Sequence, residues 1–263
     1  MTTDPGPIMT DNAPTAALLI IGNEILSGRT QDANLSFIAR YLGDLGIRFR
    51  EARVVPDVEA EIVAAINALR ARYTYVFTTG GIGPTHDDIT AECIAKAFGV
   101  PLLRHPEAVR RLEAHYAGTG LLNEARLRMA NVPEGGILID NPVSTAPGFQ
   151  IGNVFVMAGV PKIMQAMLTG LRDRLVGGPV VRTKSVISAI PEGSFADALR
   201  ALQEQVGAGV DIGSYPSFGG GKISTALVLR ATDPDLLAHT AAQVAAMLRG
   251  LGGEPVIVDG YGE

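Results

Sequence analysis

A glycine-rich segment at residues 78–90 carries the residue types best suited to chemistry in this chain. It reads TTGGIGPTHDDIT and directly follows an apolar stretch, YTYVF, at 73–77. Gly80, Gly81 and Gly83 lack a Cβ atom, so the backbone can adopt positive φ and come close to a ligand. Residues 88–99 are predicted as a helix, whose N-terminus offers unpaired N–H groups and a positive dipole end to phosphate. The segment therefore predicts a phosphate site.

Two adjacent carboxylates, Asp87 and Asp88, follow the glycines. They would repel a bare phosphate, and a Mg²⁺-type cation would remove that conflict because it binds carboxylate and phosphate oxygens together. The alternative is helix capping, since Thr85 and Asp88 have the spacing of a capping box and acids are favoured in a first turn. Three glycines within four positions exceed what a cap needs. We favour a site for phosphate and metal.

Composition and charge narrow the class of protein. The chain has 263 residues, of which 47% are hydrophobic and 19% charged, a globular balance that allows one large or two modest domains. A net charge of −5 argues against a general nucleic-acid-binding role. The single cysteine, Cys93, cannot form an internal disulfide, and its helical surroundings of Ala and Ile favour a core role over a nucleophile.

Residues 1–15 are predicted to be a disordered tail, because they lack the basic start and apolar core of a signal peptide. The longest apolar runs fall far short of the roughly 20 residues that span a bilayer. We expect a cytoplasmic protein without a membrane partner.

Strand and helix signals alternate from residue 16 onward. Strands are predicted at 16–21, 47–55 and 73–77, with helices at 32–45, 56–72 and 88–99. This series predicts an α/β fold with three layers, in which helices cover both faces of a mostly parallel sheet. Ligands bind beyond the carboxyl ends of such strands, so the loops at Gly22, Pro56 and Gly80 should meet at one edge.

The following region is less regular. Helices are predicted at 106–116 and 123–130, and short strands at 137–140, 148–151 and 154–157. Gly159 and Pro161 then begin another helix, with proline in the first turn where its missing N–H does no harm. This loop is a second candidate phosphate site, and Lys162 is available as a point charge.

A Gly-Gly-Pro break at 177–179 separates two predicted domains, 16–177 and 178–263. The second has strand and helix signals in the order βαββαβ, which is the ferredoxin-like split unit of an α+β domain. Residues 215–221, YPSFGGG, are predicted to be a long mobile connection or a lid.

Several segments together resemble the molybdopterin-binding domain family of molybdenum-cofactor biosynthesis. The resemblance is closer to the versions in the competence/damage-inducible protein CinA and in the amino-terminal domain of eukaryotic FAD synthases. It covers about residues 16–258. The segments that carry it are Thr79–Thr85 with Asp87, Asp88 and Thr90; Gly22–Leu26 with Asp32 and Asn34; Val55–Asp57; Pro142 with Thr145–Phe149; Gly159–Pro161; and Ser214–Pro216.

The resemblance implies that Asp57 and Asp88 are catalytic carboxylates and that Asp88 and Asp87 hold a divalent cation, Mg²⁺, Mn²⁺ or Co²⁺. Asp57 on its own would be interpreted as a helix N-cap. Asn23 stands where many relatives have Asp, which removes one possible metal ligand. The implied ligand-binding residues are Gly22, Glu24, Asn34, Thr79, Gly80, Gly81, Gly83, Pro84, Thr85, Thr145, Gly159, Pro161 and Lys162.

The resemblance implies binding of a phosphorylated pterin or dinucleotide, with metal-dependent pyrophosphate hydrolysis of ADP-ribose- or FAD-like dinucleotides. Two alternatives stay open: a molybdopterin-binding or adenylyl-transfer protein without hydrolysis, and a degenerate regulatory domain. We expect neither the amidohydrolase activity of CinA nor the adenylyl transfer of FAD synthase, because the resemblance does not extend to those domains. We expect a homo-oligomer with no nucleic-acid partner.

Overall fold

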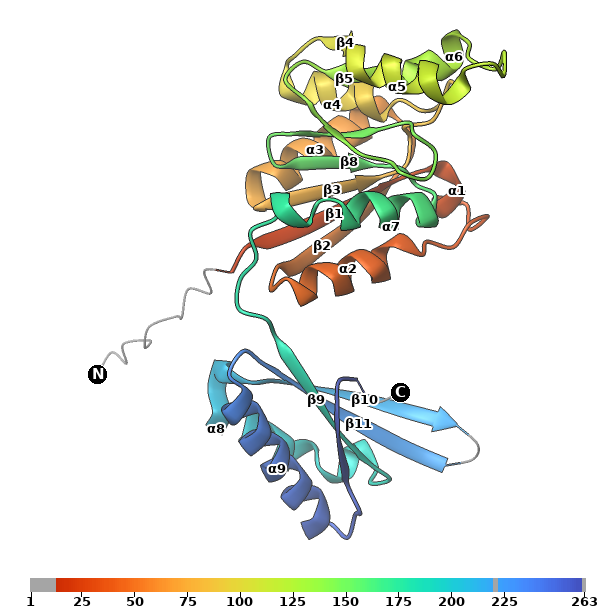
Figure 1. Cartoon of the computed structure of the whole chain (residues 1–263). Coiled ribbons are helices and arrows are strands. Elements are labelled where there is room, and N and C mark those ends of the chain that lie inside the picture. The colour runs from red at the N-terminus through yellow and green to blue at the C-terminus, as the bar shows by residue number, and fades with distance from the viewer. Residues whose placement is uncertain (1–12, 220–221, 262–263) are drawn as a thin grey trace, which may run out of the picture. The chain divides into compact units, whose positions relative to one another are not determined.

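A computed structural model describes residues 13–219 and 222–261 of the chain (Figure 1). The chain divides into two compact units, Met1–Gly178 and Pro179–Glu263. The predicted tail lies outside the described residues up to position 12. Among the described residues, no helix has both the length and the apolar character needed to cross a bilayer.

A six-stranded sheet forms the centre of the first unit, in the order β2-β1-β3-β8-β7-β6. Strand β1 pairs in parallel with β2 and β3, and β3 pairs in parallel with β8, whereas β7 is antiparallel to both neighbours. The predicted mostly parallel sheet is confirmed. Its strands are β1 Thr15–Ile21, β2 Arg48–Val55, β3 Tyr75–Thr79, β6 Ile137–Ile139, β7 Gly148–Ile151 and β8 Val154–Met157.

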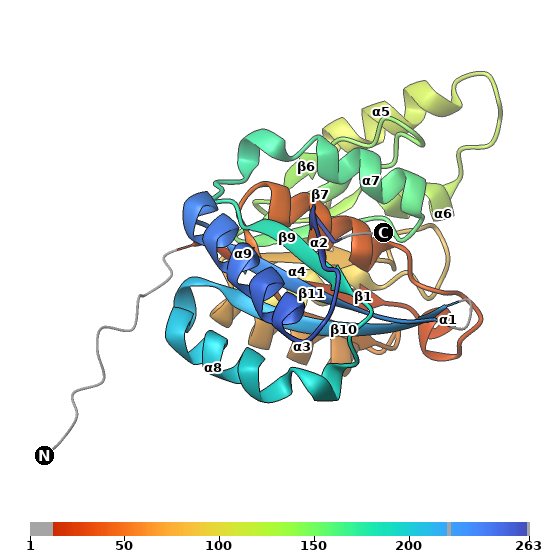
Figure 2. The same ribbon diagram turned by 90° about the horizontal axis from the view of Figure 1, so that it is seen from below.

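Helices cover both faces of this sheet, which confirms the predicted three layers (Figures 1 and 2). Alternate residues of β1 enter different cores: Leu19 packs with the α3 and α4 side, and Leu18 packs with the α2 and α7 side. A strand buried on both faces has no polar face, which explains the continuous apolar run at 16–21. The four helices are α2 Asn34–Asp44, α3 Glu59–Arg72, α4 Thr90–Phe98 and α7 Pro161–Thr169.

Smaller elements lie beside the main sheet, and some differ from the sequence predictions. The predicted helix at 123–130 is a single turn followed by a 3₁₀ helix, and the helix predicted from 88 begins at Thr90. A two-stranded sheet, β4 with β5, was not predicted because each strand has only three residues. These elements are α1 Asn23–Leu26, β4 Leu102–Arg104, α5 Pro106–Tyr116, α6 Glu124–Leu127, η1 Arg128–Ala130, β5 Asn131–Pro133 and η2 Arg172–Arg174.

The second unit has a four-stranded antiparallel sheet in the order β10-β11-β9-β12. Its main elements follow the predicted order βαββαβ. Helices α8 and α9 pack on the sheet around buried side chains that include Val186, Phe195 and Leu229. The elements are β9 Arg182–Ser188, η3 Glu192–Ser194, α8 Ala196–Val206, η4 Gly207–Gly209, β10 Asp211–Gly219, β11 Lys222–Ala231, α9 Pro234–Gly250 and β12 Val256–Asp259.

The prediction of a mobile connection or lid at 215–221 is wrong for residues 215–219. These residues continue strand β10 and pair with β11, Tyr215 opposite Ala226 and Gly219 opposite Lys222. Pro216 is compatible with a strand here because β10 is at the edge of the sheet, where a missing N–H breaks no ladder. Residues 220 and 221 lie outside the described residues.

Candidate functional site

The loop after β3 depends on two glycines with left-handed backbone. Gly80 has φ of 102° and Gly81 has φ of 65°. A Cβ atom on Gly80 would lie 2.1 Å from the carbonyl oxygen of Ile21, and one on Gly81 would lie 2.2 Å from Oγ1 of Thr90. The Thr90 backbone N–H and hydroxyl donate to the carbonyls of Gly81 and Gly80, each at 3.0 Å. The loop is therefore held tightly between β1 and the start of α4.

Asp88 closes the turn that follows these glycines. Its Oδ2 accepts from the Thr85 backbone N–H at 2.8 Å and from the Thr85 hydroxyl at 2.5 Å. The alternative of a capping box for the helix is wrong, because α4 begins at Thr90 and its N-cap, Ile89, makes no side-chain capping bond. Within the described residues both hydrogen bonds to Asp88 end on Oδ2, which leaves Oδ1 for a ligand.

Asp87 differs from its neighbour in exposure and in surroundings. Its side chain is more than half exposed, and it does not line the main cleft. The Thr85 hydroxyl can also turn to Asp87, and this hydrogen bond lowers the pKa of the Asp87 carboxyl below its ordinary value. Asp87 is thus a solvated carboxylate beside the site, whereas Asp88 lies within it.

Asp57 connects the loops that follow β1 and β2, at the carboxyl edge of the sheet. Its Oδ2 accepts from the backbone N–H of Asn23 at 2.9 Å. The alternative role as N-cap of α3 is wrong, because the N-cap is Val58 and no side chain caps that helix. Asp57 therefore fixes the backbone next to Glu24, and the cleft described below is lined by Glu24 and not by Asp57.

Asn34 connects the start of α2 to the loop before α7. Its Nδ2 donates to the carbonyl of Gly159 at 2.8 Å, and its side chain is buried. A Cβ atom on Gly159 would lie 3.3 Å from the Cα of Gly80, so the two glycine loops approach each other closely. Among the described residues, Oδ1 of Asn34 and Oγ1 of Thr79 are buried without a hydrogen-bond partner. At the start of α2, Asp32 accepts from the backbone N–H of Leu35 at 2.8 Å.

These loops surround a cleft of about 450 Å³, within the range of small-molecule sites. Seven predicted site residues line it: Glu24, Gly80, Gly81, Gly83, Asp88, Gly159 and Pro161. Its other lining residues are Thr30, Ile82, Met129, Asn141, Ser144, Ala146, Ala158, Val160 and Ile163. A smaller neighbouring pocket adds two more predicted residues, Asn34 and Thr79.

Seven predicted residues line neither of these two hollows. Thr85 and Asp57 act on the site through the hydrogen bonds described above, and Lys162 is exposed in the first turn of α7. These seven are Gly22, Asp57, Pro84, Thr85, Asp87, Thr145 and Lys162.

Asn141, which was not among the predicted site residues, organises the loop at 141–146. Its Oδ1 accepts from the backbone N–H of Val143 and Ser144, and its Nδ2 donates to the Ser144 hydroxyl and the Ala146 carbonyl. Thr145 has φ of 67°, and its hydroxyl lies 3.1 Å from Nδ1 of His115. An Asn-Pro pair at the start of a turn is the sequence signal that predicts such side-chain-to-backbone bonds.

A hard divalent cation fits the donors of this cleft. Glu24 and Asp88 are its only lining carboxylates within the described part of the chain, and no cluster of three or more His, Cys, Asp or Glu side chains is found there. Two carboxylates suit Mg²⁺, which keeps several waters and takes further oxygens from a phosphate. A closed structural zinc site would need four protein ligands. Cys93 is buried, and this burial raises the pKa of its thiol to about 11, so it is no nucleophile.

The fold and the site together define a class: three-layer α/β proteins whose glycine loops meet at the carboxyl edge of a largely parallel sheet. Residues 17–176 match the family described as "Probable molybdopterin binding domain", and residues 180–252 match "FAD synthase, middle domain". Since the first match covers more than half of the chain, the chain belongs to the molybdopterin-binding domain family. The resemblance seen in the sequence is confirmed.

Curated relatives and a solved structure agree with this family. A protein of Pyrobaculum calidifontis is 37% identical over 202 residues, which are 73% of this chain and 77% of the relative. A "CinA-like protein" of Gloeobacter violaceus is 31% identical over 95% of this chain, which spans 60% of that relative's length. The crystal structure of "the protein CinA with unknown function" from Thermoplasma acidophilum is 38% identical with a TM-score of 0.58, over 62% of this chain and 98% of that one.

Proposed function

We propose that this chain binds a phosphorylated pterin or dinucleotide in the cleft and hydrolyses the pyrophosphate bond of ADP-ribose- or FAD-like dinucleotides with a divalent cation. The observation that carries the proposal is the pairing of a left-handed glycine loop, Gly80 and Gly81, with the carboxylate of Asp88 inside one cleft. A backbone free of Cβ atoms admits a phosphate at close range, and the adjacent carboxylate admits a cation.

The phosphate is held by backbone groups and not by basic side chains. Within the described residues, the lining of the cleft includes no lysine, arginine or histidine. The N-terminus of α7 lies next to Gly159, and its positive dipole end would stabilise a bound anion. Lys162, exposed in that first turn, attracts the anionic ligand as a point charge.

Asp88 and Glu24 would hold the cation, Mg²⁺, Mn²⁺ or Co²⁺. When bound, such an ion neutralises charge on phosphate oxygens and lowers the pKa of a bound water. Asp88 keeps its orientation through the two hydrogen bonds from Thr85, and Asp57 fixes Asn23 and therefore the segment that carries Glu24. Asp57 is thus assigned a positioning role, in place of the catalytic role that the resemblance implies.

A second candidate function is molybdopterin binding or adenylyl transfer without hydrolysis. The observation that favours it is the family match, whose description names molybdopterin. We further propose a cytoplasmic homo-oligomer, which light scattering of the purified chain and cell fractionation would test.

The test is release of AMP from ADP-ribose and from FAD by the purified chain, with each of the three metals, beside a titration with molybdopterin. We expect metal-dependent AMP release that Asp88→Asn abolishes. Saturable molybdopterin binding without AMP release under any metal would contradict hydrolysis and favour the second candidate. Neither activity nor binding would favour a degenerate regulatory domain.

A further inference from the structure

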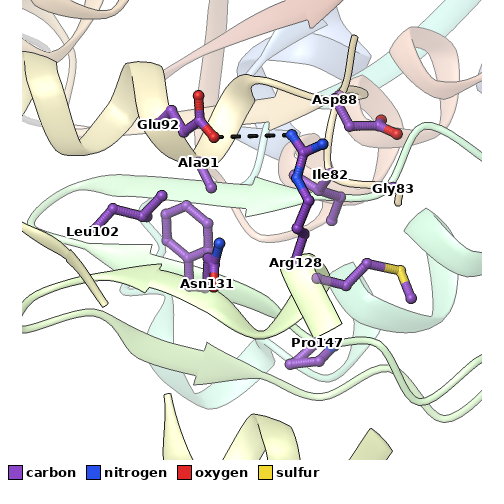
Figure 3. A pocket seen from close by; sticks show the side chains of 12 residues that line it. Ile82, Gly83, Asp88, Ala91, Glu92, Leu102, Arg128, Asn131 and Pro147 are labelled. Atoms are coloured by element: carbon purple, nitrogen blue, oxygen red, sulfur yellow. Dashed lines mark ion pairs between the residues drawn. The ribbon is translucent and has the colours of Figure 1, made fainter. Parts of the chain in front are cut away.

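A second, narrower pocket opens on the other side of the glycine loop (Figure 3). It is bounded by α4, by β4 and β5, and by the 3₁₀ helix that carries Arg128. The two hollows are neighbours, because five residues line both: Gly81, Ile82, Gly83, Asp88 and Met129. Arg128 therefore lines a hollow that shares the glycine loop with the main cleft.

Arg128 is the basic side chain that lines this pocket among the described residues, and it is held only weakly. Figure 3 shows its side chain pointing toward Glu92 and the loop of Asp88. Its guanidinium lies 3.9 Å from the Glu92 carboxylate, and within the described residues it makes no hydrogen bond. Exposed ion pairs of this kind contribute about 0–1 kcal/mol, so a better anion can displace Glu92 at small cost.

Nearby arginines are held much more firmly. Arg104 donates to Glu124 at 2.8 Å and to Asn131 at 3.1 Å, and Arg111 pairs with Asp140 at 2.5 Å. All three arginines carry five N–H donors and are exposed to a similar degree, so Arg128 differs from the other two in having only a long contact.

The second pocket adds a cation to the carboxylates of this region. Asp88 and Glu92 line it together with Arg128, whereas the main cleft is lined by Glu24 and Asp88 and by no basic side chain among the described residues. Arg128 offers a planar guanidinium suited to bidentate binding of phosphate. A monophosphate on the glycine loop would leave Arg128 paired with Glu92. A diphosphate has a second group one bridging oxygen further along, and this is the group that Arg128 would bind.

We propose that Arg128 binds the second phosphate of a pyrophosphate-linked ligand and so selects dinucleotides over mononucleotides. This inference rests on the proposed function and deepens it by naming the residue that sets the substrate class. Glu92 holds the guanidinium in place until the ligand arrives, and no bond is formed or broken by either residue.

The test compares AMP with α,β-methylene-ADP, a diphosphate that resists hydrolysis, by calorimetric titration in the presence of Mg²⁺. The variants are Arg128→Gln, Arg128→Lys, and Arg104→Gln as a matched arginine that lines neither pocket. We expect Arg128→Gln to weaken diphosphate binding at least about tenfold while AMP affinity changes less than about twofold. Arg128→Lys should restore part of the loss, since it keeps the charge without the planar fork. Arg104→Gln should change neither affinity.

Three outcomes distinguish a failure of the role proposed for Arg128 from a failure of the proposed function. Equal losses for AMP and the diphosphate, or no loss for either, would overturn the role of Arg128 and leave the proposed function intact. A loss with Arg104→Gln as large as that with Arg128→Gln would show a general charge effect and overturn it as well. A wild-type chain that binds neither nucleotide would contradict the proposed function itself, and the inference would fall with it.

Discussion

In the first unit β1, β2, β3 and β8 run parallel, whereas every strand pair of the second unit is antiparallel. Parallel strands send their carboxyl ends, and the loops that follow, to one edge of the sheet. The loops beginning at Gly22, Gly80 and Gly159 are therefore neighbours although they are far apart in sequence. Antiparallel strands alternate in direction and gather no such set. This topology favours the first unit for the proposed ligand site.

Individual glycines with positive φ also differ between the two units. In the first unit, Gly80 and Gly81 combine left-handed backbone with no room for a Cβ atom. In the second unit, Gly207, Gly252 and Gly260 also have positive φ, but a Cβ atom there would meet nothing within 4 Å. These three glycines only allow the chain to turn. At the edge of the first unit glycine also allows one backbone to pack against another.

The largest effect is expected from Asp88→Asn. The substituted side chain can still accept from Thr85, so the turn and the fold should persist. Loss of the charge should reduce metal-dependent AMP release from ADP-ribose at least about a hundredfold. Asp87→Asn is the control, because Asp87 lies outside the cleft and should retain activity within about threefold. Equal activities of Asp88→Asn and wild type would show that the carboxylate serves the turn alone.

A smaller loss is expected from Gly81→Ala, with Gly99→Ala as its matched control. The two glycines have φ of 65° and 67°, so each substitution carries a similar backbone cost of about 1–2 kcal/mol. Only at Gly81 would the new Cβ atom collide with Thr90 and displace the loop. Affinity for α,β-methylene-ADP should fall about tenfold or more with Gly81→Ala alone. Similar losses for both variants at matched melting temperatures would point to general destabilisation.

Removal of the second unit should change affinity little. A fragment of residues 13–178 keeps every residue that lines the cleft, and it includes Gly178, whose N–H donates to the carbonyl of Leu45. We expect this fragment to fold and to bind α,β-methylene-ADP within about threefold of the full chain, measured by calorimetry after circular dichroism has verified folding. A folded fragment without binding would show that residues beyond 178 complete the site.

The smallest effect is expected from the Lys184–Asp259 pair, whose contribution to the stability of the edge strand β12 depends on pH. Lys184 donates to Asp259 at 2.6 Å, and this hydrogen bond holds the pKa of the Asp259 carboxyl below its ordinary value. Since the folded-state pKa is lowered, the pair stabilises the second unit fully above about pH 4, and this contribution is lost as pH falls through the lowered value. Hydrogen exchange of β12 amides should therefore differ between wild type and Asp259→Asn at pH 7, and converge in acid. A difference that persists unchanged in acid would contradict this assignment.

Much of this architecture could be predicted because single residues constrain the backbone. Gly80 and Gly81 indicate a close loop, and the apolar run of β1 indicates a strand buried on both faces. What could not be predicted depends on contacts that are distant in sequence. The carboxylate of Asp57 turns to Asn23, 34 residues away, and Tyr215 belongs to a strand because β11 pairs with it. The residues adjacent to Asp57 and Tyr215 include neither partner. Their local sequence therefore indicated a helix cap for Asp57 and a loop for Tyr215.

The central claim, that the ligand lies on the glycine loops of the first unit, is tested most directly by amide hydrogen exchange. The full chain would be compared with and without α,β-methylene-ADP and Mg²⁺. We predict slower exchange in peptides that cover residues 78–90 and 157–168, and no change in peptides from β9, β11 and α9. Protection confined to the second unit, or saturable binding that leaves residues 78–90 unprotected, would contradict the account.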